Sequence, residues 1–553
     1  MVAAMYEPES MSRGQKVATM VGALLGLLLA ALDQTIVSTA GPFIQKDLGI
    51  EPALYVWITT AYLVASTVLV PIYGKLSDLY GRRRILLIAI GIFLAGSLAC
   101  GLAQNAAQLI AFRAVQGIGS AGLFTSAFAI AADLFAPAER GKWQGMFGAA
   151  WGVSSVIGPL LGGVITEHIG WHWTFFVNLP IGAVAISLIL SRMPPLRREH
   201  AVRPKLDIAG AVALAVATLP LLLSLSLGGE GARGAGWPWL SWQIGSLLGL
   251  SLVGLVAFIM IERRASSPIL DFQLFKIRTF TIGTIGAFTA GCAFLGAIVF
   301  LPLFMVNVVG LSATSSGLTT TPLTFGIVLA NITSGQLVAR LRAYKGLLIG
   351  SLVVLVASFA ILAYTLSTSE SQLSISTKMI LLGIGMGPSI PLFTLAIQNA
   401  VPPQQIGVAT AAATFFRQMG TTIGLALMGT IFATSFGGVL EREMPAVVAQ
   451  IPAAQQTAAA PGDQDAFDAA KATAAADASI DAAQLPAEMK TQAKQQAHAS
   501  IQRVNGVYKR AYTSALVNVF WISLAIAIAA LLITAFLPQL PLRGGAPPPP
   551  AAD

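Results

Sequence analysis

Charged residues are scarce in this sequence. Asp, Glu, Lys and Arg make up only 10% of its 553 residues, whereas hydrophobic residues make up 55% and the mean hydropathy is +0.75. No soluble globular domain has a composition of this kind. The composition therefore excludes a soluble protein and predicts an integral membrane protein.

Cysteine and histidine are almost absent as well. The two cysteines, Cys100 and Cys292, lie within apolar stretches, which argues against a disulfide framework and against metal binding. The four histidines are scattered and have neither metal-ligand nor catalytic-triad spacing. The sequence therefore predicts no metal site, no cofactor and no enzymatic activity.

Apolar stretches, in contrast, are abundant. Fourteen of them have about the 20 residues that a helix needs to cross a hydrocarbon layer of roughly 30 Å. They predict an all-α integral membrane protein. The first stretch, residues 17–40, is too long for the apolar part of a cleaved signal peptide, so we expect it to be a retained helix.

Lys and Arg are concentrated on one side of these stretches. If the N-terminus lies in the cytoplasm, the short inner loops and both tails carry most of them, including the three arginines at 82–84. We therefore expect both termini to be cytoplasmic. The net charge of +9 then reflects membrane topology, and nucleic-acid binding is not expected.

Two segments outside the apolar stretches are long. The outer loop 437–511 is rich in Ala, Gln and Asp, so it is either a helical flap over the outer mouth or a weakly ordered insertion. The tail 538–553 ends in a run of prolines and is expected to be disordered or extended.

One acid interrupts the first apolar stretch. A charged carboxylate at the position of Asp33 costs on the order of 2.5–3.5 kcal/mol, and folding alone does not require it. An acid inside the membrane is by default a proton or ion site. The alternative is a structural polar contact that locks helices together.

Arg113 is a second charge at membrane depth, in the stretch AFRAVQGIGSAGLF. Because arginine keeps its proton, this side chain must face water, backbone carbonyls or a carboxylate. Counting residues from the helix ends places Arg113 and Asp33 at similar depths, so the two are candidate partners.

The inner loop GKLSDLYGRRR resembles the signature loop of the major facilitator superfamily. In that family the loop acts as a latch for the outward-facing state. The resemblance implies that Gly74 and Gly81 shape the loop, and that Asp78 and Arg82 form the latch with Asp133 of ADLFAPAERGK. From the residues alone, Asp78 can cap the N-terminus of a neighbouring helix.

Four further motifs extend this resemblance. The stretch WGVSSVIGPLLGG is similar to the antiporter element of helix five, through Gly158, Pro159, Gly162 and Gly163. LDQTIVSTAGP around Asp33 and FFRQMGTTIG around Arg417 resemble elements of the fourteen-helix drug:proton antiporters. The R-x-x-Q-G-x-G pattern that begins at Arg113 is similar to a motif implicated in proton coupling.

The resemblance implies two six-helix bundles joined by two linker helices. On this basis the chain divides into an N-terminal tail 1–16, a bundle 17–191, a loop 192–205, linker helices 206–262, a loop 263–279, a bundle 280–537 and a tail 538–553.

The implied function is proton-coupled export of lipophilic or amphipathic small molecules by alternating access, that is, multidrug efflux and antibiotic resistance. Asp33 and Arg113 are the candidate coupling residues. The location is the plasma (inner) membrane, as a monomer, and the loop 437–511 could hold a partner on the outer side. Arg417 is open between a role with substrate or protons and a structural cap. The candidate residues for lining the substrate cavity are Trp57, Tyr62, Trp151, Phe294, Phe304, Met305 and Arg417.

Other functions stay open at this stage. The last six apolar stretches contain no acid in their cores, which argues against selectivity for dications. A dedicated exporter of a lipid or natural product would use the same fold, as would a proton-coupled importer, although the helix-five motif argues against import. A non-transporting receptor could use the loop 437–511 for docking.

Overall fold

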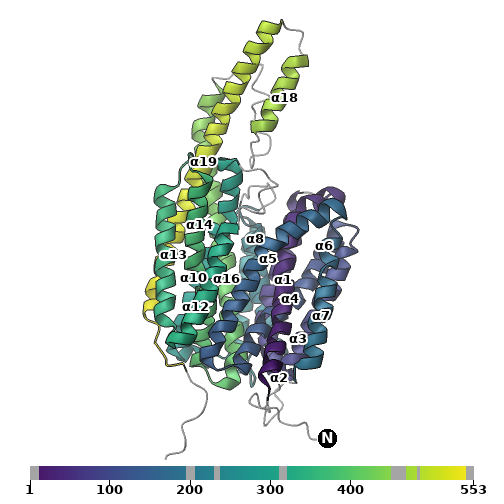
Figure 1. Ribbon diagram of the computed structural model, residues 1–553, viewed down its shortest axis with the longest axis vertical. Helices are drawn as coiled ribbons and strands as arrows, with labels where there is room; N and C mark the ends of the chain where they lie inside the picture. Colours follow the sequence, from purple (N-terminus) through teal and green to yellow (C-terminus); the bar gives the residue numbers. More distant parts are fainter. Residues whose placement is uncertain are drawn as a thin grey trace, which may run out of the picture.

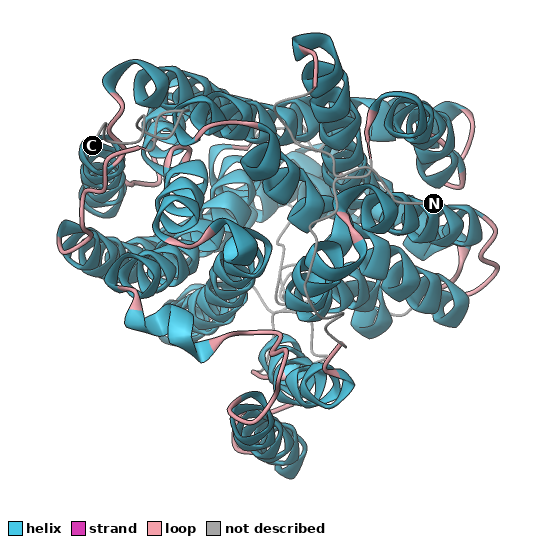
Figure 2. Ribbon diagram, turned by 90° about the horizontal axis from the view of Figure 1, so that it is seen from below, coloured by secondary structure: helices cyan, strands magenta, loops and turns pink. Residues whose placement is uncertain are grey.

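The computed structural model describes residues 11–50, 52–194, 206–229, 237–310, 321–449, 469–482 and 486–542. Within these ranges the chain forms no β-strand, and an isolated bridge joins Gly228 and Trp237. The described residues include 14 helices that are long and apolar enough to cross a membrane, which confirms the predicted all-α membrane fold. Figure 2 views the molecule from below and shows most of the helices end on.

The N-terminal half forms one bundle, drawn in purple to blue in Figure 1. Its first helix begins at a capping box, in which the Ser12 hydroxyl accepts from the backbone N–H of Gln15 and the Gln15 side chain accepts from that of Ser12. The helices of this bundle are α1 (Arg13–Asp47), α2 (Pro52–Tyr80), α3 (Arg82–Gly101), α4 (Ala106–Leu134), α5 (Pro137–His168), α6 (Trp173–Phe176) and α7 (Asn178–Arg192).

The C-terminal half forms a second bundle beside the first, in green to yellow (Figure 1). Two helices, α8 (Ile208–Leu227) and α9 (Trp242–Glu262), pack on each other between the two halves of the sequence, and α8 also contacts α2. The second bundle contains η2 (Phe272–Lys276), α10 (Arg278–Phe304), η3 (Met305–Val309), α12 (Thr321–Leu341), α13 (Lys345–Thr365), α14 (Gln372–Met386), α15 (Ser389–Ala400), η5 (Pro403–Gln405), α16 (Ile406–Val448) and α19 (Ala487–Ala535).

The two bundles touch near the end of the molecule where α1 begins. There α5 packs on α12 so closely that a Cβ at Gly145 would lie 2.6 Å from the carbonyl oxygen of Asn331. We call this end the Asp78 face and the opposite end the α18 face, after α18 (Ala469–Ala482). In Figure 1 the ribbons of the bundles lie together at the Asp78 face and stand apart at the α18 face.

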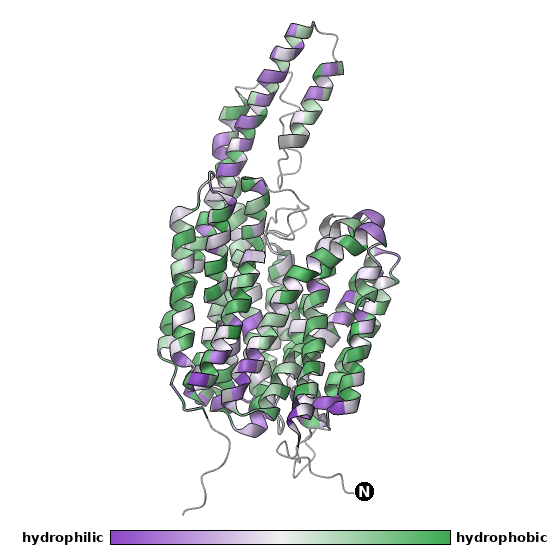
Figure 3. Ribbon diagram, viewed as in Figure 1, coloured by the Kyte–Doolittle hydropathy of each residue, from purple (hydrophilic) through white to green (hydrophobic). Residues whose placement is uncertain are grey.

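Helices α16 and α19 extend beyond the bundle at the α18 face. They have 43 and 49 residues, so at 1.5 Å per residue they are about 64 and 74 Å long, against a hydrocarbon layer of roughly 30 Å. Their projecting ends are more polar than the bundles (Figure 3). Within 437–511 the described residues are therefore mainly helical, and the predictions for 450–468 lie outside the described residues.

The short helix α18 packs along the projecting part of α19. Ala476 of α18 meets Ala497 and Ile501 of α19 in a small apolar cluster. Lys494 and Asp481 form an ion pair of 2.8 Å at its edge, and the ammonium of Lys494 lowers the pKa of the Asp481 carboxyl. The segment has few large apolar side chains, so its apolar contact with α19 is small.

The tail predicted from residue 538 is packed at its beginning. The Tyr344 hydroxyl donates to the carbonyl of Pro538 and accepts from the N–H of Leu540, and Asn399 donates to the carbonyl of Pro541. Leu542 is buried. The expectation of a disordered tail over all of 538–553 therefore does not hold for 538–542, because apolar and backbone groups there have partners. The predictions for 1–10, 195–205 and 543–553 lie outside the described residues.

Candidate functional site

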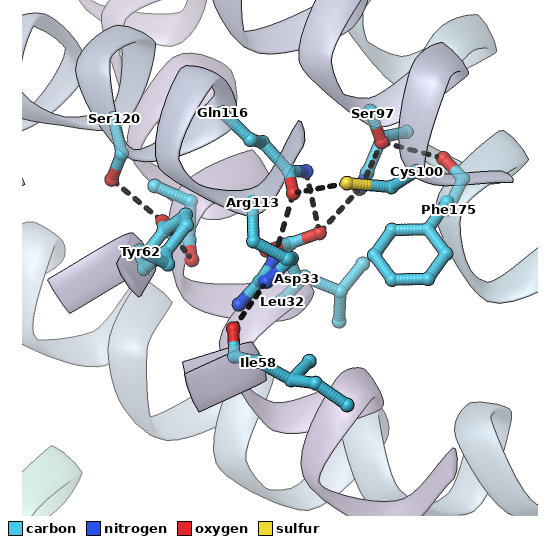
Figure 4. Close-up of polar contacts among 12 residues, drawn as sticks. Leu32, Asp33, Ile58, Tyr62, Ser97, Cys100, Arg113, Gln116, Ser120 and Phe175 are labelled. Atoms are coloured by element: carbon cyan, nitrogen blue, oxygen red, sulfur yellow. Dashed lines mark hydrogen bonds and ion pairs between the residues drawn. The ribbon is translucent and has the colours of Figure 1, made fainter. Parts of the chain in front are cut away.

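Asp33 is fully buried in the middle of α1 and has three donors. Its Oδ2 lies 2.6 Å from Nη1 of Arg113 on α4, which is buried as well. Its Oδ1 accepts from Nε2 of Gln116 at 2.7 Å and from Nδ2 of Asn178 at 3.0 Å. Figure 4 shows this network among α1, α4 and their neighbours. The structure therefore brings together the two charges that the sequence analysis paired.

Arg113 is held from several sides. Its Nε donates to the carbonyl of Ile58 at 3.1 Å and its Nη1 donates to Oε1 of Gln116 at 2.7 Å. Its guanidinium carbon lies 4.3 Å from the centre of the Tyr62 ring, within the range of a cation–π interaction. The Tyr62 hydroxyl donates to Ser120 at 2.6 Å (Figure 4). Tyr62, predicted to line the substrate cavity, is instead fully buried in this network.

Asn178 is a member of the network that the sequence analysis missed. It is the first residue of α7, directly after the break that separates α7 from α6. Its Nδ2 also donates to Ser97, whose hydroxyl donates to the carbonyl of Phe175. An amide side chain within an otherwise apolar segment was the available signal. Among the described residues the Oδ1 atom of Asn178 has no hydrogen-bond partner.

This arrangement can bind one proton and can change its contacts when it does. The carboxylate of Asp33 accepts three hydrogen bonds, one of them from the buried guanidinium of Arg113, whose charge it compensates. Protonation would remove the negative charge that compensates Arg113. Leaving one member of a buried ion pair unpaired costs about 3–5 kcal/mol, enough to favour a different helix arrangement.

The helix-five motif places α5 directly against α1 beside Asp33. A Cβ at Gly158 would collide with the Thr35 hydroxyl, and that hydroxyl donates to the carbonyl of Ser154 at 2.9 Å. A Cβ at Gly162 would lie 2.9 Å from the carbonyl of Ile36. These two glycines thus allow α5 to approach the turn of α1 that follows Asp33.

The other two residues of this motif have different surroundings. Pro159 lies inside α5, between the two glycines that contact α1. A Cβ at Gly163 would have no atom within 4 Å, so the close approach does not depend on it.

Gly158→Ala should therefore impair transport, while Gly163→Ala should not. The new methyl group at Gly158 must displace Thr35, and overpacking of this kind costs about 1–3 kcal/mol. We expect substrate export to fall several-fold in Gly158→Ala and to stay at the wild-type level in Gly163→Ala, in cells with matched expression. Equal activity of the two variants would contradict a role for the α1–α5 contact.

A second charged cluster lies at the Asp78 face. Arg82 pairs with Asp78 at 2.5 Å and with Asp133 at 2.7 Å, and it also donates to the Ser77 hydroxyl. Asp78 Oδ2 accepts from the backbone N–H of Val408 at 3.1 Å. Val408 lies in the first turn of α16, so Asp78 caps a helix of the other bundle, as the sequence analysis allowed.

Two glycines of the signature loop occupy positions that disfavour any other residue. Gly81 precedes α3 with φ of 94°, a left-handed backbone conformation that glycine adopts without strain. A Cβ at Gly74 would collide with the side chain of Ala411 on α16. The cluster and these glycines therefore join the two bundles across α2 and α16.

The aromatic candidates for a substrate cavity have mixed positions. Trp57 and Trp151 are half-buried, and Trp151 stacks on Phe124 with ring centres 5.7 Å apart. Phe294, Phe304 and Met305 are buried in the apolar core of the C-terminal bundle, and their role in lining a cavity stays a prediction. Residue type alone does not distinguish a packed aromatic from one that faces a cavity.

Arg417 is half-buried on α16. Among the described residues its guanidinium has neither a carboxylate nor a hydrogen-bond partner, so the alternative of a cap on facing carbonyls has no contact to support it. Arg417 thus differs from Arg113, which contacts Asp33, Gln116 and the carbonyl of Ile58.

Residues 23–425 match the profile of the Major Facilitator Superfamily. The chain is 39% identical over 439 residues to the multidrug transporter protein MdtP of Bacillus subtilis (strain 168), covering 79% of each chain. It is 29% identical over 463 residues to the tetracenomycin C resistance and export protein of Streptomyces glaucescens, covering 83% of this chain and 84% of that one. The proton:xylose symporter XylE, solved with bound 6-bromo-6-deoxy-D-glucose, has a similar fold, with a TM-score of 0.59 at 13% identity over 96% of this chain and 97% of that one.

Proposed function

The chain belongs to the major facilitator superfamily, and on that premise we propose that it is a proton-coupled exporter of lipophilic or amphipathic small molecules. It is a multi-pass membrane transporter of the efflux type rather than an enzyme. Beyond this, we propose that protons are the coupling ion and that protons and substrate move in opposite directions. The two bundles open the central site to the two sides of the membrane in turn.

The buried Asp33 network carries this proposal. Asp33 lies in the middle of its helix, whereas Asp78 and Asp133 lie at helix ends. A coupling carboxylate must release its proton on one side and bind a proton from the other side. In this structure Asp33 is paired with Arg113, and we propose that a movement of the helices that separates the pair accompanies binding of the proton.

The substrate class rests on the relatives. MdtP is named a multidrug transporter and the Streptomyces protein an export protein for tetracenomycin C. We propose by analogy that this chain exports amphipathic compounds, antibiotics among them. We further propose that it acts as a monomer in the plasma (inner) membrane with both termini in the cytoplasm, because the basic residues are concentrated on that side.

Inverted membrane vesicles test the function directly. In such vesicles the cytoplasmic side faces outward, so an exporter should accumulate a fluorescent amphipathic dye when the lumen is made acidic. We expect uptake in vesicles with the wild-type chain, abolished by a protonophore and absent in vesicles without the chain. Uptake that is indifferent to the protonophore would contradict proton coupling. A chain that moves no dye while well expressed would contradict broad specificity and favour one dedicated substrate.

A further inference from the structure

Arg417 is a charged side chain near the middle of the membrane-spanning part of α16. It lies about 17 Å along the helix from Ile406, close to half of a 30 Å hydrocarbon layer. Arginine keeps its proton, and a charge at this depth is costly unless it is compensated. Among the described residues, however, the guanidinium of Arg417 has no partner.

The side of α16 that carries Arg417 packs on α15 and α10 of the C-terminal bundle. Thr410 lies two turns before Arg417 on the same side of the helix. The Thr410 hydroxyl accepts from Gln398 of α15 at 2.9 Å, and Oε1 of Gln398 accepts from Gln144 of α5 at 3.0 Å. Gln398 thus joins α16 to the N-terminal bundle. Arg417 lies about 10 Å from this contact along α16, toward the α18 face, where the bundles diverge (Figure 1).

Neighbouring packing supports this location. Gly420 and Gly424, which follow Arg417 on the same side, lie against Phe288 and Cys292 of α10. The backbone of Arg417 therefore lies on the inner side of the C-terminal bundle. Arg417 keeps some exposure, so its side chain is not sealed within that bundle.

Within the part of the chain that the structure describes, no acid forms an ion pair with this charge. Asp33 already accepts from Arg113, Gln116 and Asn178. The hydroxyls beside Arg417 are engaged too, since Thr421 and Thr422 donate to backbone carbonyls of their own helix. The side-chain oxygen of Gln418 is buried without a hydrogen-bond partner among the described residues, so a second polar atom next to Arg417 is also free.

We propose that Arg417 binds an acidic group of the exported substrate, such as a carboxylate or a sulfonate on an apolar body. The guanidinium supplies two parallel donors that match such a group, and the interior of the membrane strengthens the pair. The unpartnered side-chain oxygen of Gln418 is a further acceptor on the adjoining side of α16. This inference rests on the proposed export function and names its substrate class.

Two probes with the same apolar body and opposite charges test the inference. Pyrenebutyrate carries a carboxylate, and a pyrenylbutyl trimethylammonium salt carries a cation. Transport is measured in proteoliposomes of phosphatidylcholine alone, so that no anionic lipid headgroup can bind Arg417. We expect the wild-type chain to transport the carboxylate, and Arg417→Gln to lower that rate by about tenfold or more, because the charge-assisted pair is lost.

The comparison between probes separates binding from folding. Arg417→Gln should transport the ammonium probe at the wild-type rate or faster, and Arg417→Lys should retain part of the carboxylate transport. Arg340→Gln, which removes an exposed arginine at the end of α12, is the matched control and should change neither rate. Equal loss of both probes in Arg417→Gln, or undiminished carboxylate transport, would overturn the inference.

The outcome also separates this inference from the proposed function. Proton-driven transport of the ammonium probe without any transport of the carboxylate would overturn the acidic substrate class and leave the exporter intact. A wild-type chain that moves neither probe would overturn the inference, and the assay in inverted vesicles then shows whether the export function fails as well.

Discussion

Asp33→Asn should abolish proton-driven export. The substitution keeps the size of the side chain, but it replaces one accepting oxygen by an NH2 donor and removes the carboxylate of the network. It also leaves Arg113 buried without a counter-charge, which costs about 3–5 kcal/mol. In energised cells we expect dye efflux to fall to the level of cells without the transporter, and the protonophore to have no further effect.

Two variants show whether this loss concerns protons or packing. Asp47→Asn changes another acid of α1, which accepts from the indole N–H of Trp171 at 2.8 Å outside the network, and it should export normally. The double variant Asp33→Asn/Arg113→Gln removes both charges, so it should regain thermal stability without regaining proton-driven export. Restored export in the double variant would mean that Asp33 serves only to neutralise Arg113.

Arg82→Ala should remove most transport by opening the contact at the Asp78 face. Arg82 is buried between Asp78 and Asp133, and its loss leaves two acids close together without their shared cation. Asp78 would then hold the first turn of α16 less firmly, and the bundles would separate more often at this face. With a loss of about 3–5 kcal/mol for a buried pair, we expect export to fall by at least tenfold.

A cysteine at Ala411 reports on this opening. Ala411 is buried against Gly74 of the other bundle, so a thiol at that position should react slowly with a maleimide while the bundles touch. In a background without Cys100 and Cys292, Arg82→Ala should accelerate the reaction. Arg83→Ala is the control, because Arg83 is partly exposed and donates to the carbonyl of Leu190 within its own bundle. Equal reaction rates in the two variants would contradict a latch.

The sequence predicted much of this architecture for physical reasons. Spanning helices need long apolar stretches, so their number and order could be read directly, and the mid-membrane charges Asp33 and Arg113 stood out because few residues of that kind are tolerated there. Their pairing followed from depth alone. The partners Gln116 and Asn178 depend on which faces of α4 and α7 meet α1, and one sequence does not contain that information.

Aromatic and flexible-looking segments were harder to predict. Tyr62 and Phe304 have the composition of cavity residues, yet one supports Arg113 and the other fills a bundle core. Apolar residues are favourable in both places, so hydrophobicity does not separate them. In the same way, the Ala-rich composition of 437–511 allowed helix but could not show that α16 and α19 continue through the membrane boundary as single helices.

Because α19 is one unbroken helix, its projecting end moves together with the C-terminal bundle. Ala487 lies about 38 Å along the helix from Tyr512, so any tilt of the C-terminal bundle is magnified at that end. One fluorophore at the projecting end of α19 and another at the end of α1 on the α18 face would therefore report a tilt of the bundles. The distance between the two labels should change strongly in each transport cycle. The projecting helices thus allow movement of the bundles to be followed by single-molecule fluorescence with both labels far from Asp33 and Arg113.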